Sequence, residues 1–136
     1  MEVSDINPIE DHSAGETTLG LQLYLVRMMA ITPFDDAIES YMEDHREAFD
    51  AHLEWLRKIE ADGTMLASGV LKDENSWDGS GMAIIRAKSY DEAVAISEAE
   101  PFHVAGVRKN EVQGWVLNEA NFQISLKLMN QEISVG

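Results

Sequence analysis

The chain has 136 residues, of which 45% are hydrophobic and 26% are charged, values that are typical of one globular domain. It contains no cysteine, which excludes disulfide bonds, thiolate nucleophiles and cysteine-ligated zinc. Its 25 acidic and 10 basic side chains give a formal net charge of −15, and a surface of this sign repels nucleic-acid phosphates and anionic lipids. We therefore expect neither a nucleic-acid nor a membrane partner.

The first part of the chain carries many acidic residues and little apolar pattern. Residues 1–16 lack the basic and then apolar order of a signal peptide, and no apolar run reaches the length of a membrane span. We expect a cytoplasmic protein in which residues 1–18 form a flexible acidic leader and residues 19–136 form a single domain.

The next segment alternates with a period of two, which is typical of a strand. Leu19, Leu21, Leu23 and Leu25 alternate with other residues, so we expect them on the core face, with Tyr24 and Val26 on the opposite face. Residues 35–62 have the helical period instead, and Gly63 is a typical helix-ending residue. One stripe of this predicted helix carries Met42, His45, Phe49, His52, Leu53, Leu56 and Ile59.

The remaining elements are shorter. Residues 64–71 and 81–88 are predicted strands that flank a polar loop at 72–80. Ser89 and Glu92 have the spacing of a capping box, which predicts a helix to about residue 99, and Pro101 interrupts it. Residues 107–117 and 122–128 are predicted to be the last two strands.

This order predicts an α+β fold, the ferredoxin-like βαββαβ arrangement with an antiparallel sheet and an extra C-terminal strand. Two helices can cover only one face of the sheet. The other face is too apolar to remain in water, so we expect a second copy of the chain to cover it. The predicted assembly is a homodimer or a higher homo-oligomer.

Several short segments together resemble the YciI-like (YCII-related) family. These segments are His52-Leu53-Glu54-Trp55-Leu56, Gly63, Ala67-Ser68-Gly69-Val70-Leu71, Ser89 to Ala99 followed by Glu100-Pro101-Phe102, Ala105-Gly106-Val107, and an aromatic at Trp115. Each motif is weak by itself, and their order and spacing from about Leu21 to Leu117 carry the resemblance.

The resemblance implies a dimeric α+β barrel with a pocket between sheet and helix. In the family, a helix His and the Asp of an Asp-Pro pair are proposed as a catalytic dyad, which here correspond to His52 and Glu100. Glu100 stands in place of the Asp, Val70 in place of a Pro, and Phe49 in place of an Arg that is common three residues before the His. Some relatives are dehydrochlorinases, but the family does not fix a substrate.

A His paired with a carboxylate suits general acid–base catalysis near neutral pH. Because the chain has no Cys and no Ser in a nucleophile-elbow motif, a lyase or isomerase acting on a small molecule fits better than covalent acyl chemistry. Two alternatives remain open. In the first, the same pocket belongs to a non-catalytic ligand-binding or accessory module. In the second, His52 is a half-buried core histidine on the apolar stripe.

Other residues are predicted to contribute to substrate binding. Trp77 is a candidate lid over a flat ligand or a packing residue, and Phe102 is a candidate pocket wall. Ser68 and Arg86 complete the predicted substrate-binding set, with pairing to acidic neighbours as the alternative role of Arg86. His45 lies about 10 Å along a helix axis from His52, which is too far for one metal ion, so we predict no metal site and no cofactor.

Overall fold

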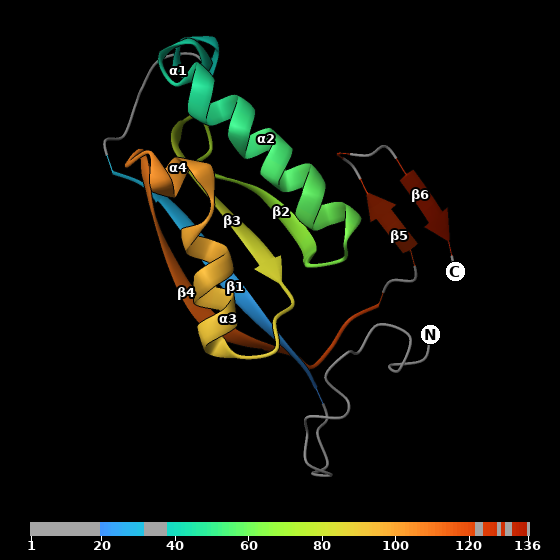
Figure 1. Cartoon of the computed structure of the whole chain (residues 1–136). Coiled ribbons are helices and arrows are strands. Elements are labelled where there is room, and N and C mark those ends of the chain that lie inside the picture. The colour runs from blue at the N-terminus through green and yellow to red at the C-terminus, as the bar shows by residue number, and fades with distance from the viewer. Residues whose placement is uncertain (1–19, 32–37, 122–123, 128, 130–131, 136) are drawn as a thin grey trace.

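A computed structural model describes residues 20–31, 38–121, 124–127, 129 and 132–135, and the predicted leader lies outside them. The elements are β1 (Leu21–Ala30), α1 (Ile38–Asp44), α2 (Arg46–Ala61), β2 (Met65–Lys72), β3 (Trp77–Ile85), α3 (Tyr90–Glu98), α4 (Pro101–Val104), β4 (Arg108–Leu117), β5 (Ile124–Lys127) and β6 (Glu132–Val135) (Figure 1). None of the described helices is long and apolar enough to span a membrane.

Four strands form one antiparallel sheet in the order β2-β3-β1-β4, with helices on one side of it. This is the strand order of a ferredoxin-like βαββαβ fold, so the predicted α+β class is confirmed. The C-terminal segment differs from the prediction in one respect. It contains two short strands, β5 and β6, which pair with each other in a separate two-stranded sheet.

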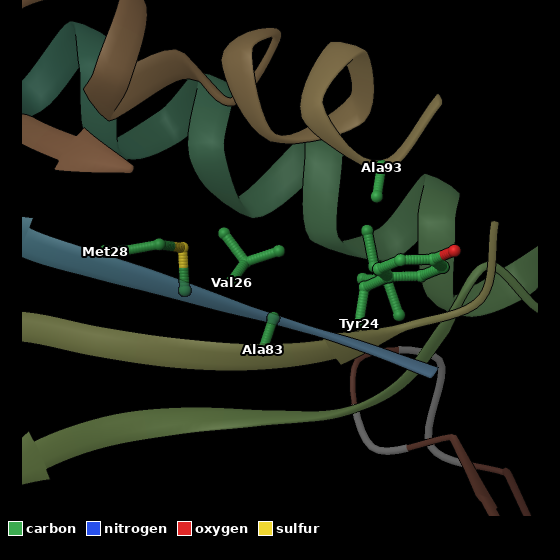
Figure 2. Close-up of a cluster of buried hydrophobic side chains, with 6 residues drawn as sticks. Tyr24, Val26, Met28, Ala83 and Ala93 are labelled. Atoms are coloured by element: carbon green, nitrogen blue, oxygen red, sulfur yellow. The ribbon is translucent and has the colours of Figure 1, made fainter. Parts of the chain in front are cut away.

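The helices cover the face of the sheet opposite to the one that was predicted. Tyr24, Val26 and Met28 point toward the helices and pack in one cluster with Ala83, Ile85 and Ala93 of α3 (Figure 2). The Leu residues of β1 lie on the other face, where Leu21 and Leu23 cluster with Ile84. The period of two was sufficient to separate the faces, but both sets are apolar, so the pattern could not show which set the helices cover.

The first predicted helix is in fact two helices. The chain leaves helical geometry at His45, whose φ of −124° and ψ of 35° place it at the start of α2. Neither Pro nor Gly marks the break, so the apolar stripe continues through it and the sequence pattern predicts one helix. The predicted end is correct, because α2 ends at Ala61 and Gly63 follows with a φ of 83°, in the left-handed region that favours glycine.

The β2–β3 hairpin is tighter than the predicted loop at 72–80. The amide of Asp73 donates to the Ser76 carbonyl at 2.8 Å, and Trp77 already pairs with Lys72 across the two strands. The register of the β2–β3 pairing shifts between Val70 and Lys72, so the two strands are not paired regularly at this end of the hairpin. Trp77 therefore lies in β3 and not in a polar loop, which corrects the premise of the lid hypothesis.

Gly81 lies where two backbones approach closely, and this predicts a position-specific cost of adding a side chain. A Cβ on Gly81 would lie 2.9 Å from the Gly69 carbonyl oxygen of β2, whereas a Cβ on Gly69 meets nothing within 4 Å. We expect Gly81→Ala to reduce the free energy of unfolding by about 1–3 kcal/mol in urea titrations, because β2 must move away. Gly69→Ala is the control and should change it by less than about 0.5 kcal/mol. Equal effects of the two substitutions would contradict the close approach.

Candidate active site

Glu100 is the centre of the candidate site. It precedes α4, and its side chain is completely buried, at 0% exposure. The carboxylate curls back onto its own backbone, so that Oε2 accepts the Phe102 amide proton at 2.7 Å and Oε1 accepts that of His103 at 3.2 Å. The break at Pro101 therefore positions a carboxylate at the start of a short helical turn.

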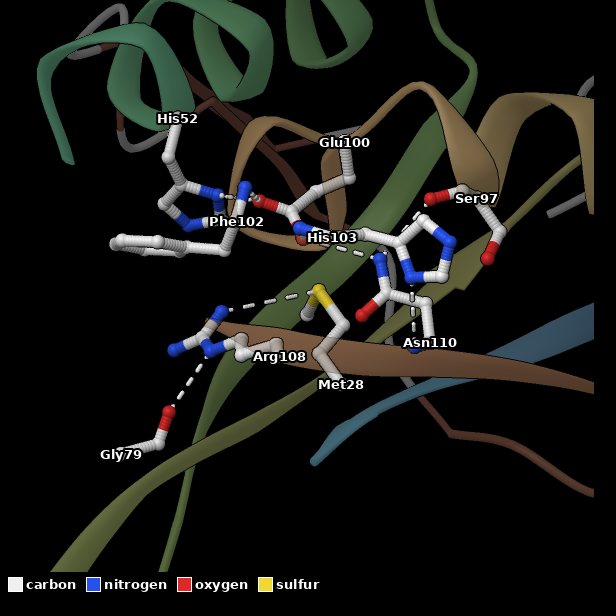
Figure 3. Close-up of polar contacts among 9 residues, drawn as sticks. All are labelled: Met28, His52, Gly79, Ser97, Glu100, Phe102, His103, Arg108 and Asn110. Atoms are coloured by element: carbon white, nitrogen blue, oxygen red, sulfur yellow. Dashed lines mark hydrogen bonds and ion pairs between the residues drawn. The ribbon is translucent and has the colours of Figure 1, made fainter. Parts of the chain in front are cut away.

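His52 reaches this carboxylate from the middle of α2. Its Nδ1 lies 2.7 Å from Oε2 of Glu100, and His52 is only 8% exposed. The predicted contact between the two residues is therefore present, although 48 positions separate them in the sequence (Figure 3). The distance is typical of a charge-assisted hydrogen bond.

Asn110 of β4 completes the set of groups around Glu100. Its Nδ2 donates to Oε1 of Glu100 at 3.0 Å and to the Ser97 carbonyl at 2.9 Å. Its backbone amide donates to Nδ1 of His103 at 3.1 Å. Asn110 is not among the site residues predicted from the sequence, although Asn is depleted in strands and its presence in β4 is the signal that could have identified it.

The Glu100 carboxylate is held in its ionised form. Burial raises the pKa of Glu100, but hydrogen bonds from His52, Asn110 and the Phe102 amide, together with the charge of His52, more than offset it, so the pKa lies below its usual value. Because an ionised carboxylate only accepts hydrogen bonds, Nδ1 of His52 carries the proton that it donates. The unprotonated nitrogen of neutral His52 is therefore Nε2, which bonds to none of the described residues.

Aromatic and cationic groups surround the His52 ring. The Phe102 ring centroid lies 4.7 Å from that of His52, and the indole of Trp55 stacks on His52 at 6.0 Å. The Arg108 guanidinium lies 4.7 Å from the centroid of Phe102, and its Nε donates to the Gly79 carbonyl at 2.8 Å. Phe102 is 1% exposed and Arg108 is 4% exposed. The predicted wall residue Phe102 therefore packs between the His52 ring and a buried cation, as Figure 3 shows.

Comparison with known proteins identifies the family of the chain. The model of the YCII-related domain matches residues 26–116, which is more than half of the chain. The chain belongs to the YCII-related family. The family match contains all of the residues described around His52 and Glu100.

One solved structure similar to this YCII-related chain is a 5-chloro-2-hydroxyhydroquinone dehydrochlorinase from Burkholderia phenoliruptrix AC1100, in complex with 2,5-dihydroxybenzoquinone. The two proteins share 22% sequence identity, and the match covers 68% of this chain and 92% of the other, with a TM-score of 0.48. None of the curated proteins compared with the chain matches it.

The departures from the family pattern are accommodated locally. Glu100 is one methylene longer than the Asp of the pattern, and the curled side chain retracts its carboxylate onto the amides of Phe102 and His103. Phe49, which stands in place of the Arg, lies 6.3 Å from Phe102 between ring centroids. Val70, which stands in place of the Pro, is 53% exposed on β2.

The other predicted substrate-binding residues, Trp77, Ser68 and Arg86, lie on β3, on β2 and directly after β3. Trp77 donates from Nε1 to the Ser80 carbonyl at 2.6 Å, so its indole is held by the backbone of its own strand, β3. Ser68 is exposed on β2, opposite Ala83.

Arg86 is held at the turn between α2 and β2. Its Nη1 donates to the Gly63 carbonyl at 2.7 Å, and burial lowers the pKa of Arg86 below its usual value. No contact in the described part of the chain joins Arg86 to His52 or Glu100. The described residues also contain no group of three or more His, Cys, Asp or Glu side chains that could hold a metal ion.

The lowered pKa of Glu100 predicts how stability changes with pH. Because the folded state favours the ionised carboxylate, Glu100 stabilises the fold above its ordinary pKa of 4.5, and this contribution is lost as the pH falls below that value. A Gln at this position cannot titrate. We therefore expect the difference in unfolding free energy between the wild-type chain and Glu100→Gln to shrink between pH 6 and pH 3 in urea titrations, and a constant difference would contradict the lowered pKa.

Proposed function

We propose that the chain is a small-molecule enzyme of the lyase or isomerase type, in which His52 is the general base and acid and Glu100 orients it. The observation that carries the proposal is the 2.7 Å contact between Nδ1 of His52 and Oε2 of Glu100. Each carboxylate oxygen of Glu100 accepts two hydrogen bonds, so the carboxylate itself is poorly placed to bind a substrate. Proton transfer therefore falls to Nε2 of His52.

The surroundings of His52 favour an organic substrate with an apolar or aromatic body. Trp55 and Phe102 flank the imidazole, and both present ring surface to it. Removal of a proton next to an electron-withdrawing group, followed by elimination or reprotonation, needs a positioned base and no covalent intermediate. The chain has no cysteine to form such an intermediate.

A screen for ligands tests this proposal and requires no assumption about the identity of the substrate. A metabolite library is tested for thermal stabilisation of the wild-type protein, and each hit is then incubated with the protein and followed by NMR for chemical change. We expect at least one hit that is converted by the wild type and only bound by His52→Ala. His45→Ala is the control, because His45 lies at the start of the same helix and not at its centre.

A ligand-binding or accessory module, in which His52 and Glu100 stabilise the fold and do no chemistry, is the second candidate function, and the burial of this pair favours it. His52 and Glu100 are 8% and 0% exposed, and such enclosure is also typical of a hydrogen-bond network that only stabilises a core. In that case ligands bind to wild-type protein and are returned unchanged after long incubation, and His52→Ala affects affinity alone. Conversion of any hit by the wild type but not by His52→Ala excludes this alternative.

We also propose that the chain assembles as a homodimer through the face of the sheet that the helices leave uncovered. On this face Trp115, which pairs with Leu23, remains 41% exposed, and Met29 remains 39% exposed. Exposed large apolar side chains on a sheet face are typical of an interface with a second sheet. We expect light scattering at micromolar concentration to give the mass of two chains, and Trp115→Lys to give the mass of one. A wild-type mass of one chain would contradict the proposal.

A further inference from the structure

The hydrogen bond to Glu100 does not by itself fix the plane of the His52 ring. It holds one atom of the imidazole, Nδ1, at 2.7 Å from Oε2 of Glu100 and leaves the tilt of the ring about this point open. Nε2, the nitrogen that the proposed mechanism uses, lies on the other side of the ring and moves when the ring tilts. Because a general base acts only from a productive geometry, a second contact on the ring matters for the reaction.

Phe102 supplies this second contact. Its ring centroid lies 4.7 Å from that of His52, and the two ring planes meet at 36°. The backbone amide of Phe102 donates to Oε2 of Glu100 at 2.7 Å, so the residue is fixed relative to the same carboxylate oxygen that His52 contacts. Phe102 is 1% exposed. The orientation of its ring therefore sets the plane of the imidazole.

Arg108 contacts the Phe102 ring in turn. Its Cζ lies 4.7 Å from the ring centroid, and Figure 3 shows Phe102 between His52 and the guanidinium. The guanidinium of this β4 residue is attached to two other strands, because Nε donates to the Gly79 carbonyl of β3 at 2.8 Å and Nη1 lies 3.9 Å from Sδ of Met28 in β1. Cation–π contacts are strongest where water is excluded, and Arg108 is 4% exposed.

We infer that Arg108 is a positioning residue for the proposed reaction. Its cation holds the Phe102 ring, and this ring holds the plane of His52, so that Nε2 keeps one direction. Arg108 acts through two rings and does not itself contact the substrate. Its effect on the rate rests on the proposed function, whereas its effect on the His52 ring does not and is measurable without a substrate.

Three substitutions separate the charge of Arg108 from its hydrogen bond. Arg108→Lys keeps a cation for Phe102, Arg108→Gln keeps an uncharged donor for the Gly79 carbonyl, and Arg108→Met keeps neither. NMR relaxation of the labelled His52 ring, well below the melting temperature, measures its order parameter. We expect about 0.85 in the wild type and Arg108→Lys, and below about 0.6 in the other two variants. Lys109→Met, which removes an exposed cation from the next position of β4, is the control and should match the wild type.

Kinetics on a converted substrate add a second readout. We expect Arg108→Gln to lower kcat by about tenfold to 10²-fold with little change in KM, because a misplacement of about 1 Å costs about 10²-fold in rate. Arg108→Lys should lose less than about threefold. Phe102→Leu removes the ring on which the cation acts, so Arg108→Gln in that background should cause no further loss.

Two results would contradict this role of Arg108. If Arg108→Gln keeps the His52 ring ordered and Arg108→Lys does not, the hydrogen bond to Gly79 matters and the cation does not. If all three variants keep the ring ordered, Arg108 is only a core residue, even where kcat falls. Where Arg108→Gln and Arg108→Met do not fold, Arg108→Lys and Phe102→Leu decide, because the ring must stay ordered in the first and lose order in the second. A wild type that converts no substrate would contradict the proposed function and leave the ring measurement decisive for Arg108.

Discussion

Glu100→Ala should lower the free energy of unfolding by about 3–5 kcal/mol, the range for removing one partner of a buried charged pair. The substitution leaves four donors without their acceptor: Nδ1 of His52, the amides of Phe102 and His103, and Nδ2 of Asn110. These donors come from α2, α4 and β4, so the loss affects the packing of both helices on the sheet. Urea titration at pH 7 measures the effect.

Glu98→Ala is the matched control for this substitution. Glu98 lies two residues before Glu100, at the end of α3, and its side chain is exposed. We expect it to change the unfolding free energy by less than about 0.5 kcal/mol. If Glu100→Ala loses less than about 1 kcal/mol, water has replaced the carboxylate, and the network is not the structural link between the helices and the sheet.

The fold was predictable because its main signals are local. The alternation in β1, the capping box at Ser89 and the Gly63 end of α2 each follow from a few neighbouring residues, and all three are present. The side chain of Glu92 extends the cap by accepting the Lys88 amide at 2.7 Å. Where two local patterns were equally apolar, as on the two faces of β1, the sequence could not assign a partner to either face.

The candidate site was predictable in part, for a different reason. His52 and Glu100 came from a family resemblance, and their contact joins residues 48 positions apart. The role of Asn110 depends on the close approach of β4 to the end of α3, which no local pattern indicates. Arg108 and Trp77 depend on the tight β2–β3 hairpin, because it brings Gly79 and Ser80 to their donors. These contacts exist only once the strands and helices have assembled around the sheet, so local sequence patterns could not predict them.

On a substrate that the wild type converts, we expect His52→Gln to lower kcat by about 10²–10⁴-fold, the contribution that is typical of a positioned general acid or base. Glu100→Gln should lower kcat within the same range while KM changes little, because Glu100 acts through the orientation of His52. His45→Gln is the control and should stay within about twofold of wild-type kcat, because His45 lies at the start of α2.

A substrate-independent measurement tests the same mechanism. Because Glu100 only accepts hydrogen bonds, neutral His52 should carry its proton on Nδ1, and the ¹⁵N chemical shifts of its ring should show an unprotonated Nε2. In Glu100→Gln, the amide of the new side chain can donate to Nδ1, so the proton should move to Nε2 and the base should be lost. If the ring of the wild type carries its proton on Nε2, the orientation that the mechanism requires is absent. An unchanged tautomer in Glu100→Gln together with an unchanged kcat would leave Glu100 as a purely structural residue.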